Sequence, residues 1–335
     1  MRAYRIHEMA GPEALKLEDL PDPRPGSGQV LIRVRAASLN YRDLMVIKGQ
    51  YSRNLPLPLI PLSDGAGEVV EVGPGATKFR PGDRVAGCFM PAWVDGPPGE
   101  EAMKSALGGA VDGMLAELVA LPESGVVKAP EYLNDEEVAS LPCAAVTAWN
   151  ALFEGEPLKP GETVLVQGTG GVSLFAIQLA KAAGARVIAT SSSDEKLARA
   201  REMGASDGIN YKTTPDWDVA ARNLTDGQGV DRVVEVGGAG TLPRSIKATR
   251  PGGQIALIGV LTGGGQVDPM PLLMKSIRLR GIYVGSRAMF ERMNRMLALH
   301  RIRPTVDRVF PFEQAAEAYK HLESGSHFGK VVIRV

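Results

Sequence analysis

The sequence predicts an α/β fold in which a doubly wound parallel sheet of six strands accompanies a β-rich domain. Two observations predict this class. From residue 163 onward, short apolar runs alternate with helical stretches, a pattern typical of a parallel sheet with crossover helices. Before about residue 125, short alternating stretches are separated by turns rich in proline and glycine, which is typical of a compact β domain.

Composition excludes several classes of protein. The 335 residues suffice for about two domains that each bury a core. The 38 Lys and Arg balance the 38 Asp and Glu, so no basic surface predicts binding to nucleic acid or to a membrane. We expect a cytoplasmic protein, since no apolar run approaches ~20 residues and the N-terminus has no signal-peptide core. Cys88 and Cys143 are too few for a disulfide framework, which fits a reducing compartment.

The stretch 163–184 predicts a phosphate-binding turn. An apolar run at 164–166 is typical of a buried strand, and Gly168, Gly170 and Gly171 then make a tight turn into a helix rich in Ala and Leu. A pyrophosphate can approach such a backbone, where the first N–H groups and the positive dipole end of the helix stabilise its charge.

Ser173 stands where the dinucleotide fingerprint has its third glycine, and it is small enough to keep helix and strand close. We expect the cofactor to contact the turn and the first helical residues, namely Thr169, Gly170, Gly171 and Val172.

The residues after the next strand, 186–190, favour NADP(H) as the cofactor. An NAD-specific site usually has an acid there, whereas this chain has Ser191, Ser192 and Ser193. Hydroxyls can donate to a ribose 2′-phosphate, and Lys196 adds positive charge one turn into the next helix. The serines can equally serve as caps of the helix that opens near Asp194, and both roles can hold together.

Four further strands are expected at 207–211, 231–236, 254–260 and 279–284, with helices between them. Thr214 and Pro215 are expected as an N-cap and a first helical residue, and Gly184 and Gly204 as helix ends. Ligands of a doubly wound sheet lie at the carboxyl ends of its strands. We therefore expect cofactor contacts from the residues that follow these strands, namely Gly237, Gly259, Val260, Gly285, Ser286 and Arg287.

The domain boundaries are expected near residues 125 and 300. Residues 1–125 form the β-rich domain, residues 126–300 the cofactor domain, and residues 301–335 return to the first domain through a strand at 330–335. Asn134 is expected to open a helix that runs towards Trp149.

Six motifs carry a family resemblance: SLNYRD (38–43), DGAGEVVEVG (64–73), PGDRV (81–85), LPCAAVTAWNAL (141–152), VLVQGTGGV (164–172) and HFGKVVI (327–333). On these motifs the chain resembles, over essentially its whole length, the medium-chain dehydrogenase/reductase superfamily. Within it the chain is similar to the zinc-free quinone-oxidoreductase-like branch, relatives of zeta-crystallin. The resemblance implies a GroES-like substrate domain built from both chain ends and a Rossmann cofactor domain.

The resemblance also identifies the positions that hold catalytic zinc in other members, where a Cys, a His-Glu pair and a later Cys or His bind the ion. The matching positions here are Asn40, Ser63 with Asp64, and Cys143. One soft ligand cannot build the open three-ligand site of a catalytic zinc. The segment 91–112, where the structural-zinc lobe would fall, has no cysteine. We predict that the chain binds no zinc, and that Cys143 is a small core residue near the nicotinamide or, less simply, a reactive thiol.

The resemblance further implies cofactor contacts. In similar NADPH-linked quinone reductases a Ser, a Lys and a Tyr contact the 2′-phosphate, and these match Ser191, Lys196 and Tyr211. The nicotinamide end is bordered there by residues that match Asn40, Tyr51, Thr147 and Lys330. Other roles stay open, because Asn40 is also suited to a turn, Tyr51 to a surface lid and Lys330 to a solvated strand.

The chemistry favours an activated substrate. Reducing a simple ketone creates an alkoxide, which ordinarily needs a metal or a strong proton donor. No tyrosine has a lysine four residues later, so the Tyr-x-x-x-Lys alternative is absent. A conjugated carbonyl or a quinone delocalises the charge, so modest donors suffice. We expect NADPH-dependent reduction of a small apolar enone, quinone or other carbonyl compound, with Asn40 positioning and Tyr51 donating a proton. Arg42 and Asp43 are weaker candidates.

Two alternatives stay open at this point: a metal-independent alcohol or aldehyde dehydrogenase, and a crystallin-like structural protein that binds NADPH without turnover. The segment 89–113 can either cover the substrate, with Met90, Trp93 and Met103 as apolar lining, or be an ordinary packed loop. The strand at 279–284 is expected at the edge of the sheet, so we expect a homodimer that covers it.

Overall fold

The computed structural model describes residues 1–52, 54–259 and 261–335, which form two compact units. The first unit comprises Met1–Val146 and Val284–Val335, and the second comprises Thr147–Tyr283. The division therefore falls about twenty residues later than expected at its first boundary and earlier at its second. No helix among the described residues is long and apolar enough to cross a bilayer.

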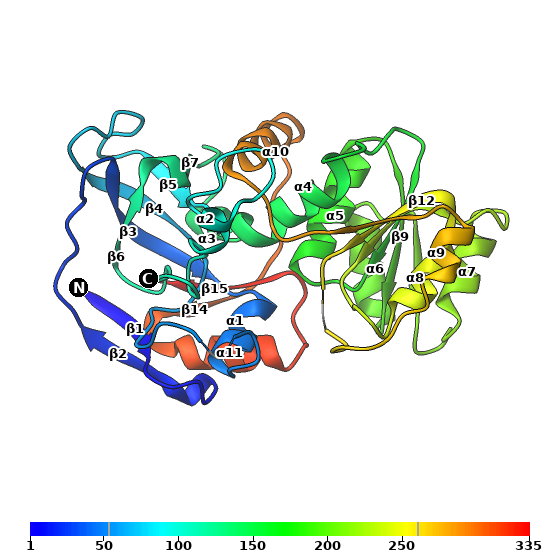
Figure 1. Cartoon of the computed structure of the whole chain (residues 1–335), viewed down its shortest axis with the longest axis horizontal. Coiled ribbons are helices and arrows are strands. Elements are labelled where there is room, and N and C mark those ends of the chain that lie inside the picture. The colour runs from blue at the N-terminus through cyan, green and yellow to red at the C-terminus, as the bar shows by residue number, and fades with distance from the viewer. Residues whose placement is uncertain (53, 260) are drawn as a thin grey trace. The chain divides into compact units, whose positions relative to one another are not determined.

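The second unit contains a six-stranded parallel sheet, as predicted (Figure 1). Its strands are β8 (Thr163–Gln167), β9 (Arg186–Ser191), β10 (Asp207–Asn210), β11 (Val230–Glu235), β12 (Thr249–Leu257) and β13 (Arg278–Gly281). They lie in the order β10-β9-β8-β11-β12-β13. Successive strands are thus added on one side of β8 up to β10 and on its other side from β11 onward. This doubly wound order confirms the predicted fold class. Strand β13 lies at one edge and ends at Gly281, before the expected end; whether a second copy covers this edge stays a prediction.

Helices connect these strands: α4 (Val146–Phe153, which begins at the junction of the units), α5 (Gly171–Ala182), α6 (Asp194–Met203), α7 (Trp217–Asn223), α8 (Leu242–Ala248) and α9 (Met270–Met274). Gly184 and Gly204 follow α5 and α6 with positive φ, as predicted. Thr214 and Pro215 do not open α7, because Asn210 holds them in a turn. The carbonyl of Asn210 accepts from the Thr214 N–H at 2.8 Å, and Asp216 becomes the N-cap.

The first unit contains β1 (Arg2–Ile6), β2 (Leu15–Asp19), β3 (Gln29–Ser38), β4 (Asp64–Val72), β5 (Arg84–Gly87), β6 (Leu118–Pro122), β7 (Val126–Lys128), β14 (Val306–Pro311) and β15 (Lys330–Arg334). Strands β1 and β2 pair with each other, and the other seven form one sheet. The closing strand β15 runs antiparallel to β3, with Val332 opposite Ser38. The chain end therefore returns to the first unit, as predicted.

The helices and helical turns of the first unit are η1 (Pro12–Ala14), α1 (Tyr41–Ile47), α2 (Glu100–Met103), η2 (Glu123–Gly125), α3 (Asp135–Ala139), η3 (Leu141–Ala145), α10 (Arg287–His300), η4 (Phe312–Gln314) and α11 (Ala315–Glu323). The helix predicted to open at Asn134 is interrupted: α3 ends at Ala139, and a π-helical turn that contains Pro142 precedes α4. Proline has no N–H for the regular helical bond, which accounts for the break.

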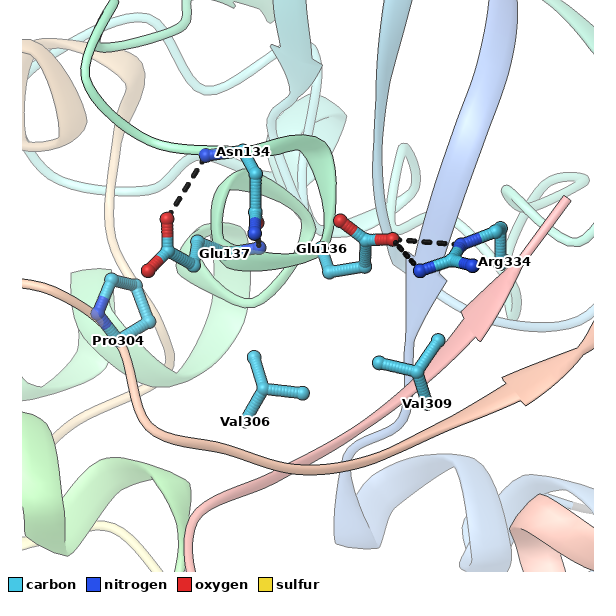
Figure 2. A pocket seen from close by; sticks show the side chains of 7 residues that line it. All are labelled: Asn134, Glu136, Glu137, Pro304, Val306, Val309 and Arg334. Carbon is cyan, nitrogen blue, oxygen red and sulfur yellow. Dashed lines mark hydrogen bonds and ion pairs between the residues drawn. The ribbon is translucent and has the colours of Figure 1, made fainter.

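Helix α3 begins with a capping box. The Asn134 side chain accepts from the Glu137 N–H at 2.8 Å, and the Glu137 carboxylate accepts from the Asn134 N–H at 2.9 Å. Figure 2 shows these residues beside a hollow of about 330 Å³ whose other side is formed by Pro304, Val306 and Val309. The polar groups around the hollow are already paired, since Arg334 binds Glu136.

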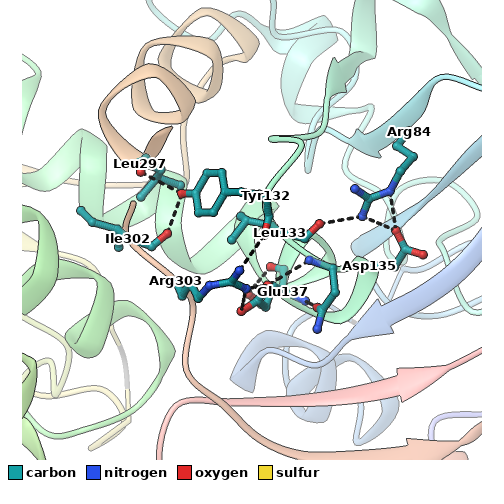
Figure 3. Close-up of polar contacts among 10 residues, drawn as sticks. Arg84, Tyr132, Leu133, Asp135, Glu137, Leu297, Ile302 and Arg303 are labelled. Atoms are coloured by element: carbon teal, nitrogen blue, oxygen red, sulfur yellow. Dashed lines mark hydrogen bonds and ion pairs between the residues drawn. The ribbon is translucent and has the colours of Figure 1, made fainter. Parts of the chain in front are cut away.

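Tyr132 explains why α10 belongs to the first unit (Figure 3). Its hydroxyl lies 2.8 Å from the carbonyl of Leu297 in α10 and 2.6 Å from that of Ile302 after it. Arg303 binds the Glu137 carboxylate at 2.8 Å, so the same stretch is tied to α3. Burial raises the pKa of Tyr132 to about 12, so the phenol stays protonated and keeps these contacts. A boundary set by such side-chain contacts leaves no local signal in the sequence.

Candidate functional site

The glycine turn of the second unit leaves an open cradle at the start of α5. Gly168 has a φ of 72°, a conformation that favours glycine, and Gly170 is the N-cap of α5 with no side-chain cap. A Cβ placed on either glycine would meet no described atom within 4 Å. The Ser173 hydroxyl donates to the carbonyl of Gln167 at 2.6 Å, which holds the helix close to β8. The first-turn N–H groups are thus available to an anion, as the fingerprint predicts.

The structure gathers the predicted 2′-phosphate residues at the carboxyl ends of two neighbouring strands. Ser191 ends β9, and its carbonyl accepts from the N–H of Tyr211, which follows β10, at 3.0 Å. Ser193 is the N-cap of α6 and accepts from the Lys196 N–H at 3.2 Å. The capping alternative therefore applies to Ser193, while Ser191 and Ser192 keep hydroxyls that can donate to a ligand.

Glu235 is a site residue that the sequence analysis missed. It is fully buried at the end of β11, and its carboxylate accepts from the Gln167 amide at 2.7 Å and from the Thr241 hydroxyl at 2.6 Å. It also accepts from the N–H groups of Gly237 and Gly238, at 2.8 and 3.0 Å. The carboxylate thereby fixes the loop that follows β11. An acid next to the carboxyl end of the expected strand 231–236 was the available signal.

The loops after β11 and β12 pack closely and line a cavity of about 530 Å³. A Cβ on Gly259 would lie 1.6 Å from the carbonyl oxygen of Val236, so only glycine permits this approach. Thr262 joins the same loops, because its N–H and its hydroxyl both donate to the Gly237 carbonyl at 2.9 Å. Gly259 lines the cavity, whereas the predicted contact Val260 lies outside the described residues.

Three predicted cofactor residues do not follow the end of a sheet strand. Strand β13 already ends at Gly281. The three residues, Gly285, Ser286 and Arg287, belong to the first unit. Ser286 is the N-cap of α10, and the Arg287 guanidinium pairs with Glu291 at 2.7 Å. Thr147 is buried in α4 of the second unit. The structure therefore distributes the predicted contacts over both units.

A buried polar network in the first unit surrounds Asn40, the N-cap of α1. The Lys330 ammonium donates to the Asn40 Oδ1 at 2.5 Å and lies 3.8 Å from Asp64 Oδ2. The Asn40 Nδ2 lies 3.4 Å from the Ser63 hydroxyl, which donates to Asp64 Oδ1 at 2.8 Å. Asp64 Oδ2 also accepts from the Cys143 N–H at 3.1 Å. The four positions matched to zinc ligands are thus together, with an ammonium group among them.

Tyr51 lies close to this network through Arg42. The Arg42 guanidinium lies 5.1 Å from the centre of the Tyr51 ring and 4.9 Å from that of Phe89, and its Nη1 donates to the Leu107 carbonyl at 2.7 Å. Arg42 therefore links Tyr51 to the segment 89–113, and its neighbour Asp43 accepts from the Asn40 N–H. Within that segment Met90 and Trp93 are buried and Met103 is exposed.

The thiols are poor metal ligands. Both cysteines are free, and burial raises the pKa of the Cys88 thiol to about 12. Burial, reinforced by the Asp64 carboxylate, also raises the pKa of Cys143 well above its ordinary value. Zinc binds the thiolate form, so a raised pKa makes a thiol a weaker ligand. Among the described residues no group of three or more His, Cys, Asp or Glu side chains is arranged to hold a metal ion.

Two known families match the chain. Residues 26–131 match the alcohol dehydrogenase GroES-like domain, and residues 171–299 match the zinc-binding dehydrogenase family. A zinc-type alcohol dehydrogenase-like protein of Schizosaccharomyces pombe is 46% identical over 99% of both chains. A quinone oxidoreductase of Rattus norvegicus is 31% identical over 99% of this chain and 97% of its own. An acryloyl-coenzyme A reductase of Metallosphaera sedula is 31% identical over 96% of both.

Solved structures agree with these matches. A putative alcohol dehydrogenase from Sinorhizobium meliloti 1021 superposes with a TM-score of 0.93, at 42% identity over 100% of this chain and 98% of its own. An NAD-dependent alcohol dehydrogenase gives 0.92 at 39% identity over 100% of both chains. A mycobacterial protein complexed with NADPH gives 0.84 at 30% identity, also over 100% of both.

Asp43 predicts a pH-dependent stability. Its carboxylate is buried and accepts from the Asn40 N–H at 2.8 Å, and burial raises its pKa from 3.8 to about 6 against the opposing charge of Arg42. The folded state therefore binds this proton more tightly than the unfolded state. The stability that Asp43 contributes is complete below about pH 4 and is lost as the pH rises through 6.

Asn at this position does not titrate, so the free energy of unfolding of Asp43→Asn, relative to the unaltered chain, should rise by about 2 kcal/mol between pH 4 and pH 7. Urea unfolding at both pH values measures it. The exposed Asp95→Asn serves as the matched control. Parallel changes in the three proteins would show that Asp43 titrates normally.

Proposed function

This chain belongs to the medium-chain dehydrogenase/reductase superfamily, among its quinone oxidoreductase-like members, and from that premise we propose that it is an NADP(H)-dependent reductase of activated double bonds or quinones that works without zinc. The oxidoreductase class follows from the family. The cofactor preference, the substrate class and the independence from zinc are the proposal.

The observation that carries the proposal is the donor set at the family's metal position. An amide, a hydroxyl and one carboxylate meet there beside the backbone of Cys143, and the carboxylate already faces the Lys330 ammonium at 3.8 Å. A bound cation would be repelled by this ammonium, and the set has no imidazole and a single cysteine, whose pKa burial raises. This argument supports zinc independence even though relatives carry zinc in their names.

The residues of the second unit support a phosphorylated dinucleotide. The uncapped start of α5 suits a pyrophosphate, and Thr169, Gly170, Gly171 and Val172 would hold it through the backbone. Ser191, Ser192, Lys196 and Tyr211 supply hydroxyls and a positive charge where an NAD site has an acid. Relatives include both an NAD-dependent enzyme and an NADPH complex, so these side chains decide our choice of NADP(H).

The substrate class follows from the weak donors of the first unit. When bound, the dihydronicotinamide supplies a hydride. An enone that accepts it at its β-carbon becomes an enolate, whose delocalised charge a hydrogen bond from the Asn40 amide can stabilise. Tyr51 is 36% exposed and can then donate a proton. The relatives named quinone oxidoreductase and acryloyl-coenzyme A reductase act on substrates of this activated kind by name.

Oxidation of NADPH and NADH by chelator-treated protein, with products identified, tests the proposal. The substrates are quinones, enones, simple ketones and aldehydes. We expect quinones or enones to react at least about ten-fold faster than simple ketones, because only they delocalise the charge. Metal analysis should find no stoichiometric zinc.

Two other outcomes would each contradict the proposal. Turnover of simple ketones and aldehydes alone would identify an alcohol dehydrogenase, and tight NADPH binding without any turnover would identify a structural protein. On the same panel Tyr51→Phe should slow turnover while NADPH binding stays unchanged; an equal rate would exclude Tyr51 as the proton donor.

Ser191→Asp tests the 2′-phosphate assignment. The new carboxylate repels the phosphate and can accept from a ribose hydroxyl, so NADPH affinity should fall by about ten-fold or more while NADH affinity is kept or improved. Fluorescence titration with both cofactors measures it. The matched control is Ser206→Asp, which adds the same charge just before β10, at the edge of the sheet where the strands begin and away from Ser191. Unchanged NADPH affinity in Ser191→Asp would refute the assignment.

A further inference from the structure

Lys330 is a buried charge that the proposed chemistry does not use. Its side chain is only 3% exposed, although lysine is among the residues least often buried. It is the first residue of β15, and the pairing of β15 with β3 brings it beside Leu39 and Asn40. Burying an ammonium group is costly unless acceptors surround it, so its contacts indicate what it does.

The Lys330 ammonium makes two hydrogen bonds and one longer ion pair. Nζ donates to the Leu39 carbonyl at 2.7 Å and to Asn40 Oδ1 at 2.5 Å, and Asp64 Oδ2 lies 3.8 Å away. With a side chain that is only 3% exposed, Lys330 is closed off from solvent by these groups. Any influence on the reaction must pass through the groups that it holds.

The ammonium determines how the Asn40 amide is oriented. An ammonium group can only donate hydrogen bonds, so it pairs with Oδ1 and would repel the NH₂ group of a flipped amide. Nδ2 must then point away from Lys330, where it meets the Ser63 hydroxyl at 3.4 Å. Ser63 in turn donates to Asp64, so its oxygen is left to accept. The chain of donors runs in one direction, from Lys330 through Asn40 and Ser63 to Asp64.

We propose that Lys330 is a positioning residue that holds the Asn40 amide with its NH₂ group directed away from β15, as a donor to the reacting molecule. The charge-assisted bond to Oδ1 also polarises the amide and strengthens its N–H donors. One N–H faces Ser63, and the second is left for the substrate oxygen or the nicotinamide end of the cofactor. This role rests on the proposed function and adds to it the group on which Asn40 depends.

A double-mutant cycle separates positioning from general support. Lys330→Met removes the donor at similar length, and Asn40→Ala removes the amide. We expect each single change to lower kcat by about ten-fold or more while the Kd for NADPH changes by less than about three-fold. Because Lys330 acts through Asn40, Lys330→Met should have no further effect on kcat in the Asn40→Ala protein.

Three further variants keep the cycle interpretable. Lys330→Gln retains an N–H donor for Oδ1 and should restore part of the lost kcat. Lys330→Met leaves the Asp64 carboxylate buried without its ion-pair partner, which could unfold the protein. Combining it with Asp64→Asn removes both charges and avoids this cost. Lys275→Met is the matched control, since the Lys275 ammonium is likewise held by carbonyl oxygens but lies in the second unit. It should lower the stability and leave kcat unchanged.

A readout that needs no turnover distinguishes failure of this inference from failure of the proposed function. Selective ¹⁵N labelling of asparagine gives the side-chain amide signals, and the pair missing from Asn40→Ala is that of Asn40. In cofactor-free protein this pair should exchange with water faster and shift in Lys330→Met, and revert towards its original position in Lys330→Gln. Unchanged signals, or effects on kcat that multiply in the double mutant, would overturn the inference. Absence of turnover by the unaltered chain would instead refute the proposed function.

Discussion

The compensation of one buried ammonium group organises the first unit. Lys330 stands at the start of the closing strand, and its partners Leu39, Asn40 and Asp64 come from the end of β3, the N-cap of α1 and the start of β4. These segments must converge for the charge to be tolerated. Helix α1 then begins at a fixed place, and the residues after its N-cap, Arg42 and Asp43, are set in turn. The packing of Tyr51 against Arg42 follows from the same constraint.

The second unit solves a related problem with a buried carboxylate. Glu235 collects donors from two glycine N–H groups and from side chains of β8 and the loop before α8, so the turns at the carboxyl ends of the strands are held in place. The glycine turn before α5 is left open beside them. In both units a satisfied buried charge fixes loop backbone, which leaves other N–H donors available for a ligand.

The local sequence pattern predicted the six parallel strands, the open turn at Gly170 and the return of β15, because each depends on a short run of neighbouring residues. Features set by distant contacts were not predictable in this way. The Tyr132 hydroxyl binds α10 to the first unit, and the Asn210 carbonyl holds a turn ahead of α7. The Glu235 carboxylate, at the end of β11, binds the loop that follows. Lys330 was expected beside the cofactor or in solvent; only the fold shows that its ammonium is occupied by Asn40 and Leu39.

The position at which the hydride arrives tests the account most directly. Metal-free protein would reduce a cyclic enone with NADPH deuterated at the transferring position, and mass spectrometry and NMR would locate the label. The account predicts a saturated ketone with deuterium on its β-carbon, formed at the same rate with and without a chelator. Deuterium on the carbonyl carbon, or a reaction that stops with the chelator and resumes with zinc, would contradict it.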